Sequence, residues 1–154
     1  MHWNGHRWSY VQVPKTVLAK SYFKHIVALG PKNVWLDVDS TFDEPAPTTV
    51  RAEHWNGKSW SSVTIPARIS YVDGMAQDGH GGLWLTGNGP EPADQYFLAH
   101  YSGGRWRTRT LPADAGDRAG TVTGISWIPG TRSVWATANY KAPGSNTGAI
   151  LKYP

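Results

Sequence analysis

The chain has 154 residues, a formal net charge of +4 and no cysteine, which excludes disulfide bonds, thiolate metal sites and cysteine nucleophiles. Nine tryptophans, 17 glycines and 11 prolines accompany only 17% charged residues, a composition typical of short strands and tight turns rather than of disorder. Because the basic residues are scattered and no apolar run approaches about 18 residues, we expect neither nucleic-acid binding nor membrane insertion.

A motif of the form His-Trp-Asn-Gly-x-x-Trp begins at His2 and His54 and recurs, weakened, at His100. The interval is about 50 residues, and in each copy a proline follows the last tryptophan six residues later. Between the copies lies a second landmark, an aliphatic residue followed by tryptophan after a turn that contains glycine. The residues repeated in this way, which we expect to be structural, are Trp8, Trp35, Trp60, Trp84, Trp106 and Trp135, with Gly5, Gly57 and Gly103.

Each copy predicts four short antiparallel strands. Asn-Gly between apolar and β-branched residues is a strong hairpin signal, and Trp60 to Ile65 alternates with the period of two that is typical of a strand. No segment has a convincing helical period. The expected strands are 7–13, 22–29, 34–38, 50–55, 58–65, 72–77, 83–86, 96–101, 105–111, 121–127, 134–140 and 149–153. Four strands per repeat predict an all-β fold, a β-propeller with four-stranded antiparallel blades and three blades per chain.

The predicted organisation is a single propeller domain over 1–154. The repeats cover approximately 15–66, 67–112 and 113–154, and residues 1–14 supply a closing strand. Three blades are fewer than the four that normally close a ring, and an open arc would expose a sheet face and a strand edge. We therefore expect a homodimer with six blades, in which each chain supplies the outermost strand of the other's third blade. The alternatives are a fragment of a longer propeller and half of a hetero-assembly.

The two ends of such blades differ. Short turns join the first to the second and the third to the fourth strand at one end, whereas the connections 39–49, 88–95, 141–148 and 112–120 share the other. Their carboxylates, amides and aromatic rings suit polyhydroxy ligands, although the composition is also ordinary for loops. The candidate ligand-binding residues are Asp39, Phe42, Asp43, Asn88, Glu91, Tyr96, Trp127, Tyr140 and Asn146. Trp127 is included because the other copies have no counterpart.

Several residue types allow more than one interpretation. The repeated tryptophans are expected to pack between blades, with a repeated ligand site as the alternative. The histidines at one repeat position cannot converge on a single ion and are expected to pack against tryptophan or cap a turn. The acidic group of Asp37, Asp39, Asp43 and Glu44 is a possible Ca²⁺ site, and no other cofactor is expected. No catalytic motif is present, although Asp37 and Asp39 could face a central channel because alternate residues of a strand point to one side.

The motif and the Val-Trp element resemble the tryptophan-rich propeller repeats of actinobacterial proteins and are similar in style to those of propeller lectins. The resemblance implies a non-catalytic, lectin-like binding module for extracellular or cell-surface glycans. It also implies a secreted or extracellular location, although the first motif begins at His2 without a recognisable signal peptide. A scaffold for protein–protein interaction and an enzyme with a site in the channel are the alternatives, because propellers host all three roles.

Overall fold

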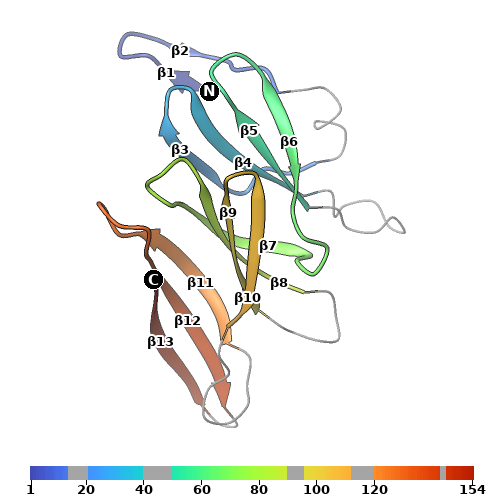
Figure 1. The fold of residues 1–154 in the computed structure, drawn as a ribbon, viewed down its shortest axis with the longest axis vertical. Coiled ribbons are helices and arrows are strands. Elements are labelled where there is room, and N and C mark those ends of the chain that lie inside the picture. Colours follow the sequence, from blue (N-terminus) through green and yellow to red (C-terminus); the bar gives the residue numbers. More distant parts are fainter. Residues whose placement is uncertain (14–20, 40–49, 90–95, 112–119, 143–144) are drawn as a thin grey trace.

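The computed structural model describes residues 1–13, 21–39, 50–89, 96–111, 120–142 and 145–154. Over these residues the protein is all-β and contains no helix (Figure 1). None of the described residues belongs to a helix that is long and apolar enough to cross a membrane. The strands form two four-stranded sheets, one three-stranded sheet and one two-stranded hairpin, all antiparallel.

The sheets follow one another along the chain. The N-terminal hairpin contains β1 (His2–Trp3) and β2 (Trp8–Ser9). The first sheet contains β3 (Ile26–Gly30), β4 (Asn33–Asp39), β5 (Val50–Trp55) and β6 (Trp60–Thr64). The second contains β7 (Tyr71–Gln77), β8 (Leu83–Asn88), β9 (Tyr96–Ser102) and β10 (Arg105–Thr110). The third contains β11 (Gly120–Trp127), β12 (Val134–Ala142) and β13 (Ser145–Tyr153).

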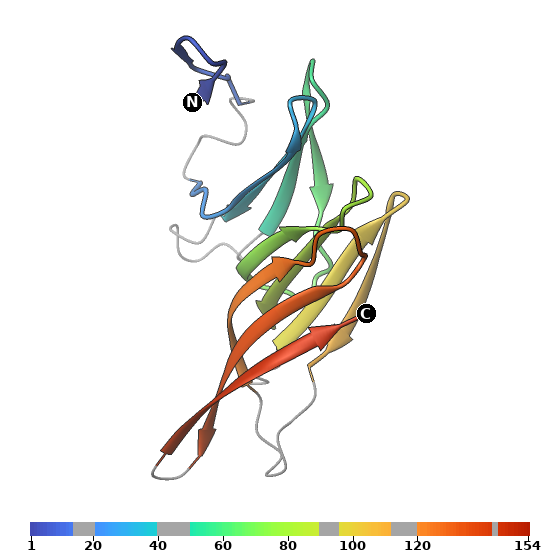
Figure 2. The ribbon, with the colours of Figure 1, turned by 90° about the vertical axis from the view of Figure 1, so that its left-hand side faces the viewer.

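Each sheet keeps its strands in sequence order, and the sheets stack face to face in the order first, second, third. The first strands of neighbouring sheets contact one another, β3 with β7 and β7 with β11. This arrangement of four-stranded antiparallel sheets is β-propeller-like, as the sequence predicted. Figure 2 shows the N-terminal hairpin at one end of the stack and the third sheet at the other.

Two connections differ from the predictions. The expected long connection 141–148 is wrong over the residues that the structure describes, because β12 continues to Ala142 and β13 begins at Ser145, with Tyr140 paired with Thr147 and Lys141 with Asn146. The expected strand 7–13 is paired only at Trp8 and Ser9, with β1 of the same chain. In both places pairing with a neighbouring strand, rather than the local sequence pattern, decided the length of the strand.

The Asn-Gly turn also differs from the expected two-residue form. Trp55 pairs with Trp60, so the turn has four residues, and its Asn56 Oδ1 accepts the amides of Lys58 and Ser59 at 2.9 Å each. The second sheet closes the same interval more tightly, since Ser102 pairs with Arg105 around Gly103 and Gly104, which have φ of 58° and 78°. Such positive angles favour glycine at both positions.

The core lies between the sheets rather than within one of them. The first core cluster joins β4 and β5 to the second sheet and contains Trp35, 2% exposed. The second joins the second sheet to the third and contains Trp84, 4% exposed. Burying a tryptophan removes about 150–250 Å² from water, which is worth about 4–6 kcal/mol of transfer free energy before entropy is counted. Inter-sheet packing is therefore the main source of stability.

Gly87 and Gly30 offer a matched test of how closely neighbouring strands approach within a sheet. A Cβ atom at Gly87 would collide with the carbonyl oxygen of Tyr71, whereas one at Gly30 would meet nothing within 4 Å. We expect Gly87→Ala to lower the free energy of unfolding by about 1–3 kcal/mol and Gly30→Ala to change it by less than about 0.5 kcal/mol. Urea denaturation followed by tryptophan fluorescence measures both. Equal effects of the two substitutions would contradict the packing of β7 against β8.

Candidate functional site

Charged side chains gather where the first strands of the first and second sheets meet. Lys24 Nζ lies 2.9 Å from Asp39 Oδ2 and 5.7 Å from the centre of the Tyr71 ring, which belongs to the second sheet. Lys24 and His25 also act electrostatically on Asp73 of β7. We call this group, which comprises Lys24, His25, Asp37, Asp39, Tyr71 and Asp73, the seam cluster.

Asp37 holds Lys24 and His25 of the seam cluster in place. β3 begins only at Ile26, and the segment before it is tied to β4 by the Asp37 carboxylate. Its Oδ1 accepts the backbone amides of Lys24 at 3.1 Å and His25 at 2.6 Å, and its Oδ2 lies 2.8 Å from His25 Nδ1. Asp37 is 1% exposed, so these contacts compensate the cost of burying its charge. Asp37 therefore positions Lys24 and His25.

Asp39, two residues further along β4, also holds the segment that precedes β3. Its backbone exchanges hydrogen bonds of 2.8 and 3.0 Å with Tyr22, and its buried carboxylate pairs with Lys24. The Lys24 side chain stays 43% exposed, and the rings of Tyr22 and Tyr71 stay 47% and 40% exposed. The seam cluster thus presents a cation and aromatic surface to solvent above buried carboxylates.

Asp73 contributes an unusual carboxyl group. It lies in a β-bulge between Val72 and Gly74, where the ladder to β8 is interrupted. Burial raises the pKa of Asp73 above its ordinary value, while the positive charges of Lys24 and His25 oppose the increase. Its Oδ2 is buried without a hydrogen-bond partner, as are Asp39 Oδ1 and Asn88 Oδ1. Unpaired acceptors at one end of two sheets favour a ligand or solvent that donates hydrogen bonds.

The sequence-predicted ligand residues that the structure describes do not all lie at the same end of the sheets. Asp39 and Asn88 end β4 and β8, and Tyr96 begins β9 opposite Asn88, so these three occupy the same end of their sheets. Tyr140 lies at that end of the third sheet, opposite Gly120. Asn146 lies on β13 rather than in a loop. Phe42, Asp43 and Glu91 fall outside the described residues.

Trp127 lies at the opposite end from Asp39. It pairs with Val134 at the end of β11, and its Nε1 donates to the Thr131 carbonyl at 2.7 Å. Its ring covers Gly79 in the turn between β7 and β8, where no Cβ could be accommodated. Trp127 therefore packs the third sheet against the second, well away from the other candidates.

The described residues contain no group of three or more His, Asp or Glu side chains that could hold a metal ion. Asp37 and Asp39 already face the His25 ring and the Lys24 ammonium. Asp43 and Glu44, which the Ca²⁺ hypothesis also requires, lie outside the described residues. Asp37 and Asp39 are therefore each engaged by a side chain of the segment that precedes β3.

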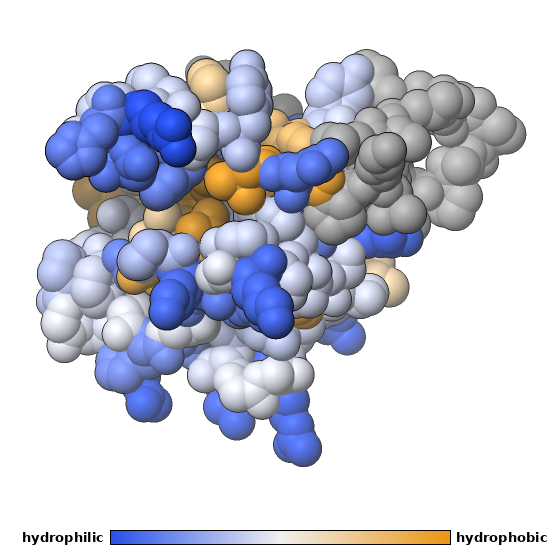
Figure 3. Space-filling view, turned by 90° about the horizontal axis from the view of Figure 1, so that it is seen from above, coloured by the Kyte–Doolittle hydropathy of each residue, from blue (hydrophilic) through white to orange (hydrophobic). Residues whose placement is uncertain are grey.

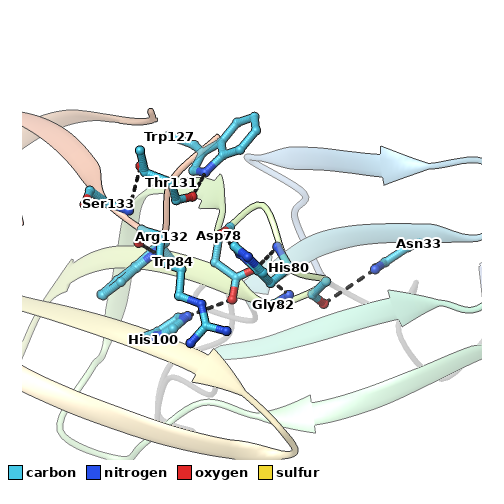
Figure 4. Close-up of polar contacts among 11 residues, drawn as sticks. Asn33, Asp78, His80, Gly82, Trp84, His100, Trp127, Thr131, Arg132 and Ser133 are labelled. Carbon is cyan, nitrogen blue, oxygen red and sulfur yellow. Dashed lines mark hydrogen bonds and ion pairs between the residues drawn. The ribbon is translucent and has the colours of Figure 1, made fainter. Parts of the chain in front are cut away.

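The other end of the sheets carries a second polar arrangement, shown in Figure 4. Asp78 Oδ2 accepts a hydrogen bond from His100 Nε2 at 2.9 Å, and the His100 ring stacks on Trp84 with centroids 4.0 Å apart. Asp78 Oδ1 accepts the amides of His80 and Gly82 at 2.8 and 2.7 Å. The first sheet repeats this arrangement with Asn33, His54 and Trp35. The ring centroids of His54 and Trp35 are 4.3 Å apart.

This repetition gives His54 and His100 a packing role, one of the two that the sequence suggested. Among the other repeated tryptophans, Trp60 and Trp106 are half-buried, whereas Trp8 is 63% and Trp135 46% exposed. The indole nitrogens of Trp84 and Trp35 are both satisfied, the first by the Arg132 carbonyl of the third sheet at 3.3 Å. The Asp78 and Asn33 arrangements therefore join neighbouring elements at the end away from the seam cluster.

No family model, curated protein or solved structure matches the chain. The candidate site therefore rests on its own geometry.

Sequence analysis missed Lys24, His25, Tyr71 and Asp73. A signal was present in the repeat, because Val27 and Ala76 lie opposite Trp35 and Trp84 and so mark one repeat position. Lys24 and Asp73 each stand three residues earlier and are therefore equivalent. Alignment of the first strands on the tryptophans would have found opposite charges at one position of adjacent sheets.

Removal of the Asp78 charge tests the second arrangement. Burial raises the pKa of Asp78, but the bonds from His100 and from the amides of His80 and Gly82, with the charge of His100, lower it overall below 3.8. The ionised group thus favours folding above pH 3.8, and this contribution is lost as the pH falls through the folded-state pKa. We expect Asp78→Asn to lose less stability than the wild type between neutral pH and about pH 2, measured by urea midpoints.

The reverse substitution in the first sheet serves as the matched experiment. Burial lowers the pKa of His54, whose partner Asn33 is neutral. Asn33→Asp places a carboxylate at that position and should raise the pKa of His54 by about one unit or more, followed by NMR of the ring protons. An unchanged His54 titration together with an unchanged acid response of Asp78→Asn would contradict the assigned contacts.

Proposed function

We propose that the protein is a non-catalytic binding module with lectin-like recognition of carbohydrate at the seam cluster. We further propose that its three sheets are blades of a propeller, that two chains form a six-bladed ring, and that the chain is related to the tryptophan-rich propeller repeats that it resembles. The propeller-like stacking of four-stranded antiparallel sheets supports the second proposal.

The observation that carries the binding proposal is the Tyr71 ring, 40% exposed, beside the half-exposed Lys24 ammonium and the half-buried Asp73 carboxyl. A sugar presents hydroxyl groups together with apolar C–H surface. An aromatic ring covers such a surface, while carboxylates and ammonium groups bond the hydroxyls. The buried Asp37 and Asp39 fix the polar groups in advance, which lowers the entropic cost of binding.

A glycan array followed by calorimetry with the strongest hit tests this proposal. We expect Tyr71→Ala to weaken binding at least about tenfold, because the loss of the aromatic surface costs more than about 1.4 kcal/mol. Tyr10→Ala is the matched control, since Tyr10 directly follows β2, is 88% exposed and takes no part in the seam cluster. An array without hits above background, or equal effects of the two substitutions, would contradict the proposal.

An enzyme with a site at the inner strands is the second candidate. It is favoured by the raised pKa of Asp73 and by Lys24, which pairs with the Asp39 carboxylate and also acts on Asp73, because carboxyl groups in different environments can act as acid and base. Such an enzyme would hydrolyse chromogenic glycosides, and Asp73→Asn would abolish turnover while ligand binding persists. Absence of turnover in the wild type, with glycan binding intact, would contradict the enzyme and leave the binding module as the remaining proposal.

A further inference from the structure

Neighbouring sheets meet through the same aromatic pair each time. Tyr101 of the second sheet contacts Trp35 of the first edge-on, with centroids 5.3 Å apart and planes at 67°. Tyr153 of the third sheet contacts Trp84 of the second with centroids 5.3 Å apart and planes at 68°. The two tyrosines occupy equivalent positions, since Tyr101 pairs with Leu83 and Tyr153 with Val134. One rule therefore governs how each sheet stacks on the next.

One repeated tryptophan, in the third sheet, lacks within the described residues the tyrosine contact that Trp35 and Trp84 make. Trp135 stands in the third sheet where Trp35 and Trp84 stand in theirs, yet it is 46% exposed against 2% and 4%. Among the described residues no aromatic ring pairs with it, and its neighbour Ile150 is 73% exposed. The outer face of the third sheet thus resembles an inter-sheet face that lacks the next sheet.

The opposite end of the stack supplies the complementary position. Trp55 pairs with Val34 in the first sheet and is therefore the counterpart of Tyr101 and Tyr153. The face of the first sheet that carries it is open, and Ile26 on that face is 67% exposed. Tyr101 and Tyr153 each contact a tryptophan of the preceding sheet, whereas only the N-terminal hairpin precedes the sheet of Trp55 in the described part of the chain.

A hollow of about 880 Å³ lies in front of this face. Figure 3 views this end of the molecule and shows apolar side chains gathered in a hollow between polar surfaces. Ile26, Leu36 and Trp55 line the hollow from the first sheet, and Met1, Val11 and Val13 line it from the hairpin segment. The hollow therefore separates the residues after β2 from the first sheet, in the layer that a preceding sheet would occupy.

We propose that the third sheet of a second copy of this chain packs against this face and fills the hollow with its side chains, with its Trp135 against Trp55 of the first copy. This inference deepens the proposed ring and commits it to a contact. The same contact made in the other direction closes two chains into a ring, because a head-to-tail interface closes when its rotation divides the circle. Trp135 would then be buried as Trp35 and Trp84 are.

The internal repeat also fixes which strands should pair. Leu98 pairs with Arg109 in the second sheet and Ala52 with Val63 in the first. The same position relates Ile150 of β13 to Val11, since both Val11 and Arg109 stand three residues after a repeated tryptophan. Residues that lie directly opposite in antiparallel strands have Cβ atoms about 4.5–5.5 Å apart. Val11 of one copy should therefore lie opposite Ile150 of the other.

A disulfide tests this register, because the chain has no cysteine of its own. The double variant Val11→Cys with Ile150→Cys should form a covalent dimer under mild oxidation, seen on a non-reducing gel. The control is Val11→Cys with Thr147→Cys, since Thr147 is exposed on the same strand but points to the opposite face. A product cross-linked within one chain, or equal dimer in both variants, would overturn the proposal.

Solution mass tests the tryptophan contact. Light scattering should give about twice the 16.9 kDa chain mass for the wild type, and Trp135→Ala should raise the dimer dissociation constant at least about tenfold. Circular dichroism checks that Trp135→Ala is folded. A wild-type monomer, or a folded Trp135→Ala that dimerises normally, would overturn the docking. Glycan binding by a monomer would contradict the dimer but not the proposed carbohydrate recognition. A cross-linked dimer that binds no glycan would contradict the carbohydrate recognition but not the dimer.

Discussion

Trp35 and Trp84 each lie between a histidine of their own sheet and a tyrosine of the next, and the sheets depend on these sandwiches for their placement. A polar acceptor fixes each histidine, the histidine covers one face of the indole, and the tyrosine meets it edge-on at 5.3 Å. Edge-to-face contacts add about 0.5–1.5 kcal/mol to the burial of the rings, and they fix the angle between sheets. Uniform stacking of blade-like sheets follows from that angle.

The seam cluster is a consequence of the same stacking at the other end. Where the sheets are stacked through these contacts, their first strands also meet, and Lys24, which precedes β3, lies near Tyr71 and Asp73 of the second sheet. The apolar contacts near Trp35 supply the stability, which allows buried carboxylates and unpaired acceptors to persist far from them. Such a division between a rigid end and a polar end is typical of scaffolds that carry a binding site.

The sequence predicted the strand architecture because its two signals, the period-two alternation of strands and the residues typical of turns, are both local. Strand 50–55 was expected at its observed bounds, and alternation together with turn residues marked most of the other strands. The seam cluster depends on distance between sheets, which no period along the chain encodes. Trp127 and Asp39 are both ligand candidates in the sequence, the first because it has no counterpart in the other copies and the second because it begins a polar connection, yet strand direction puts them at opposite ends. Pairing also extended β12 to Ala142 and began β13 at Ser145, where glycine and proline had suggested a long loop.

The two histidine sandwiches show how one contact can be built from different local sequences. In the first sheet a two-residue turn pairs Gly30 with Asn33, so a neutral amide already stands where His54 needs an acceptor. In the second sheet the turn after Gln77 has five residues, and its free amides need an acceptor of their own. Asp78 serves both amides and His100 with two oxygens, which an amide with one acceptor oxygen could not do. The charge of Asp78 is therefore a consequence of turn length rather than a sign of catalysis, and the seam cluster remains the better location for ligand chemistry.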